Sequence, residues 1–174
     1  LLAERLEIGV FCYSFVGVVI PLLITGGFHV DGYMDTMDAF HSYQPKERKL
    51  EILKDSHIGA FAVISLVIYG LIYCATFSEI RDKSLLAIVC IGFVLARCLS
   101  GIGVVTFPGA KKEGLLFLFA SKAQKTIVRS SLYVQGILCV AAMIWLSPVA
   151  GVVATVAAIL TLVYYYRRCK KELG

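Results

Sequence analysis

The chain has 174 residues, of which 59% are apolar and only 17% are charged, and its formal net charge is +5. Soluble domains contain about 45–50% apolar and about 25% charged residues, and a domain of this length could not enclose so much apolar surface. The composition therefore excludes a soluble globular protein and a disordered one, and predicts an all-α, polytopic integral membrane protein.

Uncharged apolar segments of membrane-spanning length begin near the N-terminus. The first covers residues 8–25, and two more cover 58–77 and 85–107, with Arg97 as the only charge in the third. A helix needs roughly 20 residues to cross a bilayer. Each of these segments is therefore predicted to be one span.

The last apolar segment is long enough for two spans. Residues 130–166 contain no charge over 37 positions, which at about 1.5 Å per residue is roughly 55 Å of helix. Proline disfavours the helical state in the residue before it, so the Ser147-Pro148 pair divides the segment into spans at 130–147 and 148–166. We expect five transmembrane helices in one membrane domain covering residues 1–174.

The basic residues outside the spans predict the orientation. Thirteen Lys and Arg lie in the segments 26–57, 108–129 and 167–174, whereas only three lie on the other side of the membrane. Such an excess marks the cytoplasmic side, so we expect a multi-pass protein of the cytoplasmic (cell inner) membrane with the loops 26–57 and 108–129 in the cytoplasm. This placement also explains the net charge without nucleic acid as a partner.

The loop 26–57 gathers the polar chemistry. It holds all three histidines and six of the twelve carboxylates. Asp31, Asp35 and Asp38 follow a spacing of i, i+4, i+7, which on a helix places them in one narrow stripe. Their mutual repulsion would be removed by a hard cation, and a set of oxygen ligands suits Mg²⁺, with Mn²⁺ as the alternative.

A solvated acidic face is the other interpretation of this stripe. Its position next to a span, after Gly26-Gly27 and among apolar residues, favours metal binding. Zinc would call for His or Cys ligands, and His29 is near enough in sequence to join such a set.

An amphipathic segment follows from Lys46 to Asp55. Leu50 and Leu53 form its apolar edge, and i,i+3 charge pairs support a short helix lying at the membrane surface. We expect the next residues to form a polar lip of the site at the mouth of the second span: Lys54, Asp55, Ser56 and His57.

Arg97 stands alone in the middle of the third span. A charge there costs about 2.5–3.5 kcal/mol on insertion scales, so we expect it to face the bundle interior and to pair with an anion. The anion would be a carboxylate of the acidic loop or a phosphate ligand. Basic residues such as Lys111 lie on the same side, and cations opposite metal-bound carboxylates suit phosphoryl transfer.

These motifs carry a family resemblance. The strings 26–32, 35–38 and 50–61 closely resemble the signature of the cobalamin synthase family, adenosylcobinamide-GDP ribazoletransferases. Arg97 and residues 112–114 are weaker matches in the expected order. The resemblance covers nearly the whole chain.

The chain departs from the family pattern at a few places. Ala39 stands where many members have Gly, and His57 where many have Arg. Family members usually have further membrane segments at both ends, and this chain begins at Leu1 rather than Met. We therefore expect it to be part of a longer protein.

The resemblance implies the last joining step of cobamide assembly. The 3′-hydroxyl of α-ribazole, or of its 5′-phosphate, attacks the corrinoid-linked phosphate of adenosylcobinamide-GDP, and GMP leaves. Asp31, Asp35 and Asp38 would hold Mg²⁺, and one of them or Asp55 would be the base. The expected substrate- and phosphate-binding residues are His29, Lys54, Ser56, His57, Arg97 and Lys111.

Two other functions fit the sequence less well. A CDP-alcohol phosphotransferase would have Asp-Gly-x-x-Ala-Arg, but Asp31-Gly32 is followed by Asp35-Thr36. A divalent-metal transporter would place carboxylates in mid-membrane and often has repeated halves, which this chain lacks. Besides its substrates and the lipid bilayer, we expect a second copy of the chain or other corrinoid-assembly enzymes as partners.

Overall fold

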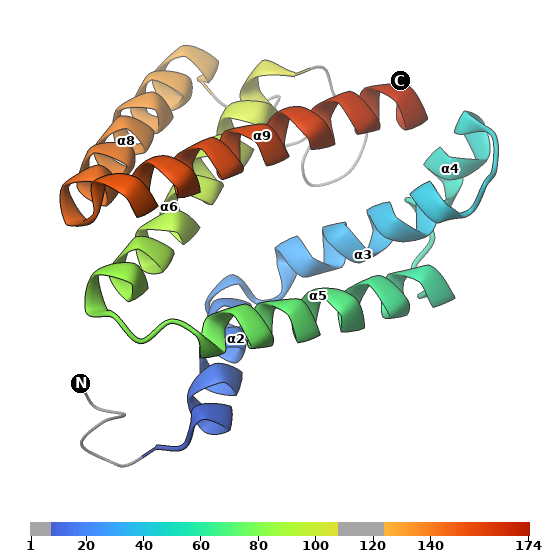
Figure 1. Cartoon of the computed structure of the whole chain (residues 1–174). Coiled ribbons are helices and arrows are strands. Elements are labelled where there is room, and N and C mark those ends of the chain that lie inside the picture. The colour runs from blue at the N-terminus through green and yellow to red at the C-terminus, as the bar shows by residue number, and fades with distance from the viewer. Residues whose placement is uncertain (1–7, 108–123) are drawn as a thin grey trace. The chain divides into compact units, whose positions relative to one another are not determined.

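The computed structural model describes residues 8–107 and 124–174, and this part of the chain contains helices but no strand (Figure 1). The expected all-α fold is confirmed. In chain order the helices are α2 (Val10–Thr25), α3 (Phe28–His41), α4 (Lys46–Ile52), α5 (Ala60–Ser78), α6 (Lys83–Thr106), α8 (Lys125–Leu146) and α9 (Pro148–Leu173).

The helices form two compact units, which meet in the sequence between Arg81 and Asp82. The first unit contains α2 to α5, and the second contains α6, α8 and nearly all of α9. Each is described by itself. The candidate site residues expected before position 81 all belong to the first unit.

Four helices are long and apolar enough to cross a membrane: α5, α6, α8 and α9. Three of them match the expected spans to within about five residues, and α9 continues beyond 166 to Leu173. Large apolar side chains point outward along them, as Leu71, Trp145 and Val149 do, with 67%, 84% and 76% of their surface exposed. Helices whose backbone groups bond internally and whose surface is apolar are suited to lipid.

The first expected span differs from the others. Helix α2 has 16 residues, or about 24 Å, and the chain then bends by 95° into α3. Gly26 and Gly27 make the bend with φ of 59° and 72°, a left-handed conformation that glycine adopts without a steric penalty. The described residues therefore contain four helices that are candidate spans, or five candidate spans if the bent α2–α3 pair is counted as one.

The acidic segment is more regular than the loop that we expected for 26–57. It contains α3 and α4, and α3 packs on α5. Thr36, Ala39 and Phe40 are buried. The helical stripe of aspartates that the i, i+4, i+7 spacing predicts is thus present on α3.

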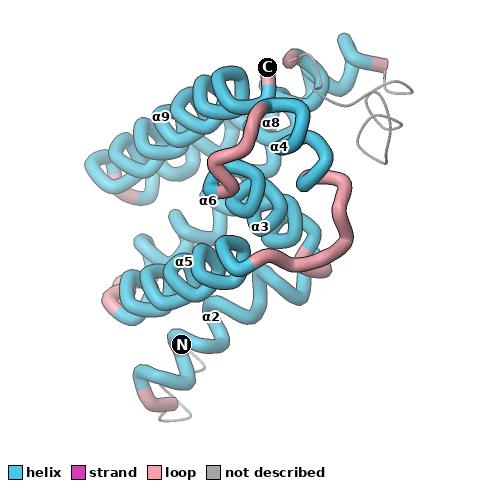
Figure 2. The backbone as a smooth tube through the Cα atoms, turned by 90° about the vertical axis from the view of Figure 1, so that its right-hand side faces the viewer, coloured by secondary structure: helices cyan, strands magenta, loops and turns pink. Residues whose placement is uncertain are grey.

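Helices α3 and α5 run antiparallel and side by side (Figure 2). Tyr33 lies against Tyr69 with ring centroids 5.8 Å apart, and His41 stacks on Phe61 at 5.6 Å. Eight residues forward along α3 therefore correspond to eight residues backward along α5. This register brings the end of α3 to the beginning of α5.

The second unit is built on α6 and α8. Ile88 and Leu95 pack with Met143 in its core, and alanines of α9 cover them. The Asp82 side chain caps α6 by accepting the N–H groups of Ser84 and Leu85. The expected turn at Ser147-Pro148 is confirmed, because Ser147 is extended (φ −156°) and Pro148 begins α9.

Candidate active site

The acidic face of α3 begins at the bend. The carbonyl of Gly27 accepts the N–H groups of Val30 and Asp31, so the helix starts directly after the two glycines. Asp31 lies in its first turn, where the helix dipole favours a negative charge. Asp31 is exposed, whereas Asp35, one turn further on, is half-buried.

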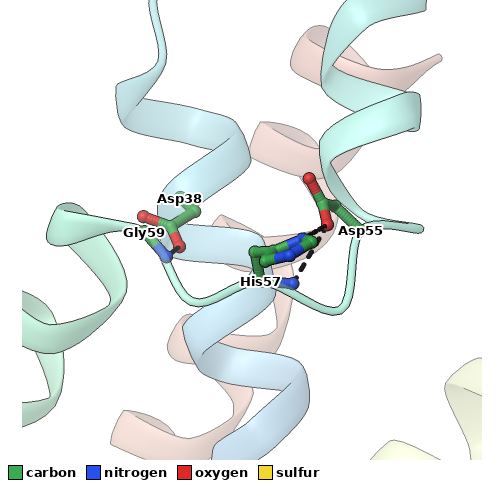
Figure 3. Close-up of polar contacts among 4 residues, drawn as sticks. All are labelled: Asp38, Asp55, His57 and Gly59. Carbon is green, nitrogen blue, oxygen red and sulfur yellow. Dashed lines mark hydrogen bonds and ion pairs between the residues drawn. The ribbon is translucent and has the colours of Figure 1, made fainter.

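Asp38 is bonded to the neighbouring helix (Figure 3). Its Oδ2 accepts the N–H of Gly59 at 2.7 Å, and its Oδ1 accepts the N–H of Ala62 at 2.8 Å. These donors belong to the first turn of α5, which has no side-chain cap of its own. The third aspartate of the stripe is thus a point of attachment between two helices.

Asp55 and His57 form a turn just before α5 (Figure 3). Oδ1 of Asp55 accepts the backbone N–H of His57 at 3.0 Å and lies 2.6 Å from Nδ1 of its ring. These two hydrogen bonds lower the pKa of the Asp55 carboxyl below its ordinary value. Both side chains are largely exposed.

The expected metal site can be compared with the positions of the acidic side chains. In residues 8–107 and 124–174, no three His, Cys, Asp or Glu side chains are grouped so that they could hold a metal ion. Asp31 and Asp35 remain as two carboxylates one helical turn apart. Mg²⁺ is commonly bound by one or two carboxylates together with water and substrate phosphates, so this pair fits Mg²⁺ shared with a pyrophosphate better than it fits an ion enclosed by protein.

The other predicted residues of the first unit flank these groups. His29 is exposed at the start of α3, with its ring edge-on to Phe28 at 5.9 Å. Lys54 and Ser56 are exposed in the segment between α4 and α5. A short helix is present as α4 with the expected Arg48–Glu51 ion pair, but it ends at Ile52, so that Leu53 of the expected apolar edge lies just beyond it.

Arg97 belongs to the second unit, and the expectation that it faces the bundle interior and pairs with an anion stays a prediction. Its neighbours Leu95 and Cys98 are buried, whereas Arg97 itself is exposed on another face of α6. The reason is geometric: the face of α6 that packs on α8 is already filled by apolar side chains. Lys111 and residues 112–114 lie outside the described residues.

Gly59 is a site residue that the sequence-based set did not contain. A Cβ at this position would lie 2.5 Å from Oδ1 of Asp38. The only signal in the sequence is a glycine at the start of the apolar segment 58–77, which does not by itself reveal a partner 21 residues away.

These observations define a polytopic helical membrane protein with a carboxylate-bearing helix fastened beside one of its spans. The chain belongs to the cobalamin-5-phosphate synthase family, whose model matches residues 1–174. No solved structure matches it.

Curated relatives agree with this assignment. The chain is 44% identical to the adenosylcobinamide-GDP ribazoletransferase of Lachnoclostridium phytofermentans over 173 residues, which are 99% of this chain and 66% of that protein. Proteins of the same name from Desulfitobacterium hafniense (31% over 160 residues) and Listeria monocytogenes (35% over 162 residues) match 90% and 91% of this chain and 62% of their own lengths. The chain thus spans less than two thirds of the length of these relatives.

Proposed function

We propose that the protein is a membrane transferase that joins adenosylcobinamide-GDP to α-ribazole, or to its 5′-phosphate, and releases GMP. Family membership and the names of the relatives support the reaction. The observation that carries the assignment of the site is the position of Asp31 and Asp35, one turn apart on a helix that is bonded to α5 through Asp38.

The transfer makes one bond and breaks one. The 3′-hydroxyl oxygen of α-ribazole bonds to the phosphorus that carries the corrinoid aminopropanol, and the bond between this phosphorus and the oxygen of GMP breaks. The hydroxyl proton goes to a base. Asp55 suits this role because it is exposed in the segment that leads into α5, and a carboxylate within reach of the hydroxyl can take its proton in the transition state.

Asp31 and Asp35 would hold Mg²⁺, or Mn²⁺ in its place. The ion would neutralise charge on the pyrophosphate and orient it, which are the roles of a metal in phosphoryl transfer. Asp38, the third expected ligand, has each oxygen bonded to one backbone N–H.

Cationic and polar groups would hold the phosphates. Lys54, Ser56 and His57 lie in the segment that leads into α5, and His29 lies next to the acidic pair in sequence. Arg97 and Lys111 complete the proposed set. With thirteen basic residues on their side of the membrane, these groups would face the cytoplasm.

The first prediction concerns Asp35. In membranes that contain the intact protein, GMP release from adenosylcobinamide-GDP and α-ribazole 5′-phosphate should require Mg²⁺. Asp35→Asn should lower it by at least about 100-fold, because even groups that only support metal ligands contribute roughly 10- to 100-fold. The measurement is GMP formation against Mg²⁺ concentration.

Glu47→Gln is the matched control, since Glu47 is an exposed carboxylate of α4 with no assigned role. It should leave GMP release unchanged. Unchanged turnover in Asp35→Asn would show that the metal assignment is wrong. A folded protein that releases no GMP would refute the proposed reaction, and CDP-alcohol substrates and metal flux would be tested next.

A further inference from the structure

The carboxylate of Asp38 uses both oxygens on the backbone of another helix. The first N–H groups of a helix have no acceptor within it, and Gly59, which precedes α5, has no side chain to supply one. Asp38 accepts the N–H of Gly59 and that of Ala62, the third residue of α5. These are the two donors that a capping box satisfies locally, and here one residue 21 and 24 positions away satisfies both.

The Asp38 carboxylate can come this close to the backbone because residue 59 is a glycine. Its backbone has φ −88° and ψ 167°, which any residue can adopt, so its conformation does not call for glycine. A Cβ would, however, lie 2.5–2.6 Å from the carboxylate atoms of Asp38. A side chain at position 59 would therefore displace Asp38 or push the two helices apart.

The packing around the contact is tight. Ala39, next to Asp38, is fully buried, and Ala62 is 1% exposed. His41 stacks on Phe61 one turn away. The carboxylate thus lies between close-packed neighbours and beside the positive end of the α5 dipole, where a negative charge is favourable.

We propose that Asp38 is a positioning residue rather than a metal ligand: through Gly59 and Ala62 it holds the Asp31–Asp35 pair in a fixed arrangement with the turn that precedes α5. Because that turn carries Asp55 and His57, Asp38 joins the carboxylates of α3 to the base. This role in transfer depends on the proposed function, but the attachment itself does not.

Hydrogen–deuterium exchange tests the attachment without any substrate. In the intact protein in lipid nanodiscs, Asp38→Ala removes both acceptors and Asp38→Asn leaves one. The amides of Gly59 and Ala62 should exchange at least about tenfold faster in Asp38→Ala, with Asp38→Asn in between, because hydrogen bonds to charged groups are among the stronger ones. Unchanged exchange in Asp38→Ala would overturn the proposal.

Glycine variants test the same contact from the α5 side. Gly59→Ala should speed the exchange of the Ala62 amide as Asp38→Ala does, and the double variant should be no faster than the faster single variant. Gly70→Ala is the matched control, since it lies in the same helix with nothing within 4 Å of its added Cβ. Additive effects of Asp38→Ala and Gly59→Ala would contradict a shared contact.

The metal dependence of GMP release separates positioning from ligation. Asp38→Ala and Gly59→Ala should both lower kcat, by about tenfold or more, and leave the half-saturating Mg²⁺ concentration unchanged, whereas Asp35→Asn should raise it. If Asp38→Ala raises the half-saturating Mg²⁺ concentration as much as Asp35→Asn does, and Gly59→Ala does not raise it, Asp38 is a metal ligand and the proposal is wrong. Absence of GMP release from the unmodified protein would refute the proposed function, and the exchange results would still decide the attachment.

Discussion

At the scale of single residues, the turn formed by Asp55 and His57 predicts a pH dependence. The hydrogen bonds from His57 lower the pKa of Asp55 in the folded protein, so they stabilise the fold above the unfolded pKa of about 3.9. That stabilisation is lost as the pH falls through the lower, folded pKa. His57→Ala keeps the backbone N–H but removes the ring, so the pKa of Asp55 should rise toward its ordinary value.

If Asp55 is the base, the acid limb of kcat/KM for GMP release should move to higher pH in His57→Ala, because the carboxylate then binds its proton at higher pH. The pH–rate profile measures this shift. In an Asp55→Asn background the acid limb due to Asp55 is absent, and the same His57→Ala change should leave the shape of the remaining pH–rate profile unchanged. A limb that does not move in the single variant would assign the base to another residue.

At the scale of helices, the bend between α2 and α3 predicts that replacing Gly by Ala changes the free energy of unfolding in opposite directions at the bend and inside a helix. Gly26 and Gly27 have positive φ, and an Ala in the left-handed conformation costs roughly 1–2 kcal/mol. Gly70 is helical, where Ala is favoured over Gly by about 1 kcal/mol. Neither bend position has an atom within 4 Å of an added Cβ, so the difference is one of backbone conformation alone.

Gly26→Ala and Gly27→Ala should therefore lower the free energy of unfolding, and Gly70→Ala should raise it. Denaturant unfolding in detergent micelles, followed by circular dichroism, measures both. Asn at position 26 or 27 should be tolerated better than Ala, because it enters the left-handed region more readily. Equal effects at all three positions would mean that the bend is not kept in the membrane.

The spans could be predicted from sequence because hydropathy is a local property. An uncharged segment of about 20 residues has few alternatives to a helix in lipid. The i, i+4, i+7 spacing likewise predicted the stripe on α3. Local spacing could not show that Asp38 bonds to residues 21 and 24 positions away, nor which face of α6 carries Arg97, because both depend on how one helix packs on another.

At the scale of the whole molecule, helix lengths and the charge distribution together predict the topology. Helix α5 has 19 residues, or about 28 Å, which is close to the thickness of the hydrocarbon core. Its two ends therefore belong to opposite faces of the membrane. The end at Gly59, with the Asp38 contact, follows a segment that contains four of the thirteen basic residues from which we expect the cytoplasmic side. The end at Glu79 leads to the sparsely charged side.

Single cysteines on either side of α5 test this orientation. In a background from which the six native cysteines have been removed, Glu79→Cys should react in intact cells with a maleimide that cannot cross the membrane. Gln44→Cys, in the exposed link between α3 and α4, should react only in inverted vesicles. The reverse labelling would place the carboxylates of α3 outside the cell and would contradict the charge-based orientation. It would also contradict the proposed reaction, because a nucleotide-linked corrinoid would then have to reach the site from outside.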